Sequence, residues 1–140
     1  MTLAFDVAGL TEYLHGIFPQ VREDFAIDAM DENGLRMRLL TADRHLRPGG
    51  TVSGPSMFAL ADCAVYALIL SRLGREALAV TTNCSIDFMR KPADGADVIA
   101  EARLLKLGRV LAVADVLMYS EGQAEPVARA SMTYSIPPKR

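Results

Sequence analysis

Apolar residues recur at two different spacings along this chain, and the spacings separate helices from strands. In residues 6–18 the apolar positions follow the three-and-four spacing of one helix face. Residues 25–30 and 35–39 instead alternate apolar and polar, and Asn33-Gly34 between them is a common tight-turn signal. The first stretch therefore predicts a helix and the second a β-hairpin.

The next pattern is a loop followed by a helix that is apolar on every face. Residues 44–54 hold three glycines and a proline, which predicts a loop that can approach another group closely. Residues 55–73 then read as a helix that Gly74 ends. Its length is near that of a membrane span, but its serines, proline and central Asp62 favour a buried helix covered by a sheet and a second subunit.

Four strand patterns joined by short turns complete the chain. They cover residues 79–89, 96–105, 110–119 and 127–136. Short turns between consecutive strands favour antiparallel pairing, so the sequence predicts an α+β fold with a mainly antiparallel sheet. The length fits a single domain over residues 1–140.

The amino-acid composition argues against several classes of function. Fifteen basic against seventeen acidic residues give a net charge of −2, which argues against a nucleic-acid binder. The two cysteines lack metal-ligand spacing, so we expect neither a disulfide framework nor a metal site. The N-terminal residues lack a signal-peptide pattern, and we expect a cytoplasmic protein without a membrane anchor.

Asp62 is the one ionisable carboxylate in the apolar helix. An unpaired buried carboxylate costs several kcal/mol, so something must compensate for it. A structural partner such as Arg47 is one explanation. A general base or nucleophile in an apolar pocket is the other.

The start of the same helix offers a second chemical group. The N–H of Gly54 can approach a carbonyl oxygen closely, and the positive end of the helix dipole favours negative charge there. Gly54 and Asp62 are two turns apart, roughly 12 Å along the axis. One acyl carbon cannot touch both, so if both act, they come from different subunits of an obligate dimer.

These residues form a recognisable motif. Arg47-Pro-Gly-Gly-Thr-Val-Ser-Gly-Pro, followed after four residues by Leu60-Ala-Asp62, resembles the hotdog-fold thioesterases of the phenylacetate-degradation (PaaI-like) type. Their motif is Asn-x-x-Gly-x-x-His-Gly-Gly-x4-Leu-Ala-Asp, and the similarity extends over residues 40–134.

The resemblance implies a long helix wrapped by a curved antiparallel sheet, in homodimers often paired into homotetramers. It implies hydrolysis of acyl-coenzyme A thioesters, with no cofactor beyond the coenzyme A of the substrate. Asp62 would activate water or attack the thioester, and the Gly54 N–H would polarise the carbonyl. A hydroxyl on the following strand would assist, with Thr82 the best match and Thr81 the alternative.

Three positions depart from the family motif. Arg47 replaces the usual Asn, Ser53 the usual His, and Pro55 the second Gly. Arg47 could bind the thioester carbonyl or pair with Asp62, and Ser53 could be a helix cap. Because Pro55 has no N–H, Gly54 alone can supply that donor.

Further candidates would bind the substrate. Basic side chains near strand ends suit the phosphates of coenzyme A, and Tyr66, one turn after Asp62, could line the acyl pocket. The basic candidates are Arg90, Lys91, Lys106 and Arg109.

Two other functions remain open from the sequence. The departures at Arg47, Ser53 and Pro55 would suit a non-catalytic acyl-CoA binding protein. A hotdog hydratase or dehydratase is the other alternative, although Ser53 stands where those enzymes need a histidine.

Overall fold

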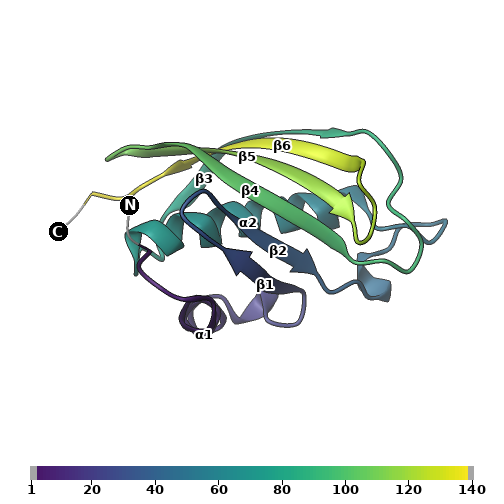
Figure 1. The fold of residues 1–140 in the computed structure, drawn as a ribbon, viewed down its shortest axis with the longest axis horizontal. Helices are drawn as coiled ribbons and strands as arrows, with labels where there is room; N and C mark the ends of the chain where they lie inside the picture. The colour runs from purple at the N-terminus through teal and green to yellow at the C-terminus, as the bar shows by residue number, and fades with distance from the viewer. Residues whose placement is uncertain (1–2, 139–140) are drawn as a thin grey trace.

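The computed structural model describes residues 3–138 and shows one antiparallel sheet arched over a long helix (Figure 1). The chain order is helix, hairpin, long helix and four strands, which confirms the predicted α+β class. Its elements are α1 (Val7–Ile17), η1 (Pro19–Val21), β1 (Phe25–Met30), β2 (Gly34–Leu39), η2 (Asp43–His45), α2 (Gly54–Leu73), β3 (Val80–Phe88), β4 (Val98–Leu107), β5 (Leu111–Ser120) and β6 (Pro126–Ser135).

The strand order is β1-β2-β4-β5-β6-β3, and every neighbouring pair is antiparallel. The hairpin therefore lies at one edge of the sheet and β3 at the other. α2 runs along the concave face, and α1 lies below β1 (Figure 1). Two elements that follow one another in the chain, α2 and β3, thus bound the open side of the molecule.

α2 forms where the sequence places it, with a cap at each end. The Ser53 Oγ accepts the Ser56 N–H at 3.2 Å, and Gly74 ends the helix at a φ of +85°. Twelve of its residues are buried, including Leu60, Leu68 and Leu70. By length and composition α2 could cross a membrane, but most of it is buried inside this fold. It is the core helix.

One stripe of α2 escapes this burial. Gly54, Phe58, Asp62 and Tyr66 recur at intervals of four, so they share one face, and none of them is fully buried. The sheet and α1 pack against the buried positions of α2. This stripe lies on the open side next to β3, and it carries the carboxylate and the amide that the sequence singles out.

The tight turn of the β1–β2 hairpin differs from the predicted type. A two-residue Asn-Gly turn needs positive φ at both residues, but neither Asn33 nor Gly34 has one. The Asp31 carboxylate instead accepts the N–H groups of Asn33 and Gly34 at 2.7 and 3.0 Å. Gly34 is required for another reason: a Cβ there would collide with the Ala102 carbonyl of β4.

β3 is an edge strand with a break in its alternation. Its register with β6 shifts between Thr81 and Asn83, so Thr82 is an extra residue in a β-bulge. Thr81 lies on the helix side before the bulge, and Cys84 and Ile86 lie on it afterwards. The bulge therefore changes which threonine faces α2.

Candidate active site around Asp62

Asp62 is held by two hydroxyl groups from neighbouring strands. The Thr81 Oγ1 of β3 and the Tyr134 hydroxyl of β6 each donate to Asp62 Oδ1 at 2.6 Å. Tyr134 also lies 3.0 Å from the Asp62 carbonyl oxygen. No arginine, lysine or histidine within residues 3–138 pairs with this carboxylate. The compensation for its partial burial is therefore hydrogen bonding by neutral groups.

The surroundings keep the neighbouring acids protonated. Burial raises the pKa of the Tyr134 phenol, and the Asp62 charge and its hydrogen bond raise it further. Burial also raises the pKa of the Cys63 thiol to about 12, with a contribution from Asp62. The pKa of Cys84 moves upward for the same two reasons. Tyr134 remains a donor, and neither thiol is an activated nucleophile.

The amide of Gly54 is the second candidate group, and it stands at the start of α2. Ser53 caps the helix, as the sequence suggested, and its hydroxyl also donates to the Ser56 hydroxyl at 3.0 Å. Within residues 3–138 no acceptor takes the Gly54 N–H. Phe88 at the end of β3 lies so close that a Cβ at Gly54 would come within 3.3 Å of its ring. The absence of a side chain at Gly54 leaves room for the Phe88 ring.

His45 holds the loop that leads into Gly54. Its carbonyl accepts the Ser53 N–H at 2.8 Å. Its Nδ1 accepts the Ala42 N–H at 2.9 Å, so its proton is on Nε2, which donates to Asp24 Oδ1 at 2.8 Å. Both ring nitrogens are engaged in hydrogen bonds, so the buried His45 anchors the loop.

Arg47 lies in the exposed part of that loop. Its backbone closes a turn with Gly50 and Thr51, and its side chain is exposed. Within the described part of the chain it forms no ion pair with Asp62. The pairing that the sequence left open is therefore not made inside one protomer.

The strand hydroxyl that contacts Asp62 is one residue away from the preferred candidate. Thr81, the alternative, contacts Asp62, whereas the preferred Thr82 is exposed and its hydroxyl donates to the Thr133 carbonyl at 3.3 Å. The bulge is the physical reason, because in an unbroken strand Thr82, Cys84 and Ile86 would share one face.

The four basic candidates do not form one cluster. Arg90 and Lys91 follow the end of β3, where Arg90 donates to the Pro126 carbonyl at 2.8 Å and pairs with Glu125 at 2.6 Å. Lys106 and Arg109 lie at the β4–β5 turn, at the same end of the sheet as the start of β3. The length of β3, about 26 Å at 3.3 Å per residue, separates the two pairs.

Tyr66 sits beside the carboxylate without touching it. Its hydroxyl donates to the Ala77 carbonyl at 2.6 Å, and its ring stacks on that of Tyr134 at 6.2 Å. The stacked pair forms one wall of the Asp62 site. The contact of Tyr134 was missed by the sequence analysis because 72 residues separate it from Asp62 and no local spacing connects them.

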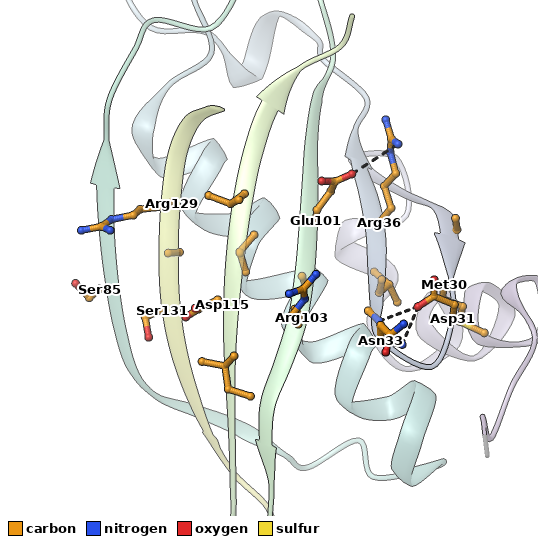
Figure 2. A pocket seen from close by; sticks show the side chains of 18 of the residues that line it. Met30, Asp31, Asn33, Arg36, Ser85, Glu101, Arg103, Asp115, Arg129 and Ser131 are labelled. Atoms are coloured by element: carbon orange, nitrogen blue, oxygen red, sulfur yellow. Dashed lines mark hydrogen bonds and ion pairs between the residues drawn. The ribbon is translucent and has the colours of Figure 1, made fainter. Parts of the chain in front are cut away.

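A wide hollow lies elsewhere, on the outer face of the sheet (Figure 2). It is an open groove of about 820 Å³ in which basic and acidic side chains alternate across the strands. Arg36 pairs with Glu101 at 3.7 Å, and Arg129 with Asp87 at 2.8 Å. Glu101 and Asp87 are thus held in ion pairs with arginines, whereas Asp62 is held by hydroxyl groups.

Comparison with known proteins identifies the family. Residues 49–127 match the model of the thioesterase superfamily. A solved structure of a candidate thioesterase from Silicibacter sp. TM1040 is 64% identical, with a TM-score of 0.93 over 99% of this chain and 96% of that one. The chain therefore belongs to the thioesterase superfamily, and the expected hotdog fold and thioesterase class are confirmed.

More distant structures support the same fold. A mutant of the phenylacetic acid degradation protein PaaI from Thermus thermophilus is 27% identical, with a TM-score of 0.73 over 85% of this chain and 99% of that one. A hypothetical thioesterase from Streptococcus pneumoniae TIGR4, solved with coenzyme A, is 21% identical, with a TM-score of 0.73 over 84% and 92%. Among proteins with curated descriptions, none matches this chain.

Proposed function

We propose that the protein hydrolyses an acyl- or aryl-acyl-CoA thioester to the free acid and coenzyme A. The observation that carries the proposal is the carboxylate of Asp62. It is oriented by Thr81 and Tyr134, lacks a cationic partner within residues 3–138 of its own protomer, and lies on the open stripe of α2 in a member of the thioesterase superfamily.

Two routes fit this carboxylate. As a base, Asp62 takes a proton from water while the water oxygen bonds to the thioester carbon. The C–S bond then breaks, and the coenzyme A thiolate receives the proton. As a nucleophile, Asp62 displaces the thiolate to form a mixed anhydride, which water then hydrolyses. Neither route needs a metal or another cofactor.

The Gly54 amide would stabilise the charge that develops on the carbonyl oxygen. It is the first residue of α2, its N–H takes no acceptor within residues 3–138, and the helix dipole adds to its positive potential. Gly54 and Asp62 of one protomer are eight residues apart on one helix. A single site therefore requires Gly54 of one protomer and Asp62 of a second.

The β3 edge offers a way to build that shared site. Its backbone is an open template for another strand, and apolar side chains are exposed on it and just before it: Leu78 74%, Val80 57% and Phe88 52%. Two copies of β3 paired antiparallel about a twofold axis would place the end near Phe88 and Gly54 opposite the partner's Thr81 end, near Asp62. The same operation would bring Arg90 and Lys91 to the end of the partner's sheet that carries Lys106 and Arg109.

This pairing gives the basic residues a common role at the phosphates of coenzyme A. The coenzyme A in the Streptococcus pneumoniae structure supports that class of ligand. Two such dimers could pack through their outer sheet faces, where alternating charges complement a rotated copy.

The decisive test is thiol release from short, medium, long-chain and aryl acyl-CoAs by wild type and Asp62→Asn. Turnover that collapses in the variant, while ligand-induced thermal stabilisation is kept, supports the hydrolase. No turnover by the wild type, with stabilisation retained, would establish the alternative acyl-CoA binding protein. Hydration of an enoyl-CoA without thiol release would favour the hydratase.

The shared site has its own test. Val80→Arg places a charge on the β3 edge, and Leu105→Arg is a matched control because Leu105 is equally exposed, at 57%, on the outer sheet face. Val80→Arg should give monomers in light scattering and lose turnover. Leu105→Arg should keep the dimer and its turnover. An active Val80→Arg monomer would refute the shared site.

A further inference from the structure

The two oxygens of the Asp62 carboxylate have different surroundings. Oδ1 receives two short hydrogen bonds, from Thr81 and from Tyr134. Oδ2 receives none from any donor within residues 3–138. An ionised carboxylate oxygen has about two lone-pair positions, so the two hydroxyls occupy Oδ1 and leave Oδ2 open.

The sheet fixes both donors together. Thr81 and Tyr134 are direct partners in the register of β3 and β6, just before the bulge. Tyr134 is 3% exposed, and its ring stacks on Tyr66 at an interplanar angle of 24°. Both donors come from one strand pairing and meet the same oxygen, so together they set the orientation of the carboxylate.

The hydroxyl of Tyr134 has one proton and two acceptors within reach. The Asp62 carbonyl at 3.0 Å would satisfy it, but the charged Oδ1 at 2.6 Å is the stronger acceptor. The raised pKa of Tyr134 keeps the proton on the phenol. Tyr134 therefore donates to the carboxylate and stays neutral while it does so.

We propose that Tyr134 is a positioning residue that, together with Thr81, holds Asp62 by Oδ1 so that the reaction runs through Oδ2. The inference rests on the proposed hydrolysis. In the base route the new O–H bond forms at Oδ2 as the O–H bond of water breaks. In the nucleophilic route the new C–O bond forms at Oδ2 as the C–S bond breaks.

The test compares kcat and KM in Tyr134→Phe, which removes only the hydroxyl oxygen. We expect kcat to fall about 10- to 100-fold, the range for a lost hydrogen bond to a charged group, with KM within about twofold of wild type. Tyr119→Phe is the matched control, because Tyr119 lies on β5 and makes no side-chain hydrogen bond within residues 3–138. Its kcat should remain that of the wild type.

A second comparison separates orientation from stability. Thr81→Val should also lower kcat, and the double variant should lose less than the product of the two single losses, because both donors act on one oxygen. Thermal unfolding reports the folded fraction of each protein. If Tyr134→Phe does not fold, Tyr134→Met replaces it, with a side chain that fills space but cannot donate.

The outcomes divide clearly. A lower kcat with unchanged KM and a folded protein supports the role. A wild-type kcat in Tyr134→Phe, or a loss that only follows the unfolded fraction, overturns it while the hydrolase stands. Absence of turnover in the wild type overturns the proposed function, and the inference with it.

Discussion

Asp62 and Asp97 are both partly buried carboxylates with two hydrogen-bond partners, but their partners differ in charge. Asp97 accepts from the Arg38 guanidinium at 2.8 Å and from the Thr41 N–H at 3.0 Å. Arg38 also pairs with Asp28 and Glu121, and these carboxylates raise its pKa. Asp62 accepts only from hydroxyls within the described chain. A guanidinium neutralises the carboxylate it holds, whereas a hydroxyl orients it and leaves its charge available for chemistry.

The same substitution at the two sites should separate activity from stability. Asp62→Asn should lower kcat by about 10²- to 10⁴-fold, the contribution of a positioned base, and keep an unfolding free energy near that of the wild type. Asp97→Asn should keep its turnover and lose about 1–2 kcal/mol of unfolding free energy, because Arg38 loses a charged partner. Steady-state kinetics and urea unfolding measure the two effects. Equal losses of activity in both variants would contradict the assignment of Asp62 to activity and Asp97 to stability.

A smaller effect is expected when one neutral donor is removed. Thr81→Val should reduce kcat by about tenfold, because one of the two bonds that orient Asp62 is lost. Thr82→Val is the neighbouring control and should cost less, since its hydroxyl faces the Thr133 carbonyl. Kinetics of the pair on one acyl-CoA would decide the question, and a larger loss in Thr82→Val would contradict the observed register.

A side chain at Gly54, the first residue of α2, should reduce activity by a smaller factor again. A Cβ in Gly54→Ala would press on the Phe88 ring, so either the ring or the amide must move by a few tenths of an ångström. We expect kcat to fall about threefold to tenfold through the displaced amide. Adding Phe88→Ala should recover part of the loss. If the double variant is no better than Gly54→Ala, the contact with Phe88 is not the cause.

The smallest effect concerns Asp24, a carboxylate that accepts hydrogen bonds from Arg44 and His45. Burial acts to raise its pKa, but hydrogen bonds from Arg44 and His45 outweigh it and lower the pKa below the ordinary value of 3.8. The unfolded chain then binds this proton first as pH falls, so the contribution of Asp24 to stability is present above about pH 3.8 and is lost below it. Urea unfolding between about pH 3 and 6 should show a shallower pH dependence in Asp24→Asn. An unchanged slope would show that other carboxylates dominate.

The sequence predicted most of the fold because local patterns determine it. The helix with Asp62, the hairpin and the four later strands all follow from periodicity and turn residues, within about two residues at their ends. The order of strands does not, since nothing local says that β3 lies at an edge beside β6.

The candidate site was predictable only in part. Asp62 and Gly54 stand out because a carboxylate and a capped glycine are conspicuous in an apolar helix. The roles of Thr81 and Tyr134 depend on a bulge and on a strand pairing across more than fifty residues. Such pairings are decided by tertiary packing, so a lone tyrosine in the last strand gives no signal of its own.

The extra residue at Thr82 also bears on how this strand can change in length. Inward-facing positions run 79 and 81 before the bulge and 84 and 86 after it. If Thr82 were deleted, these four positions would fall into one unbroken alternation, and no side chain would have to turn to the opposite face. In a stretch of strand without a bulge, a one-residue deletion would invert every position beyond it. β3 is thus a strand in which evolution or a designer can remove a residue and keep the core.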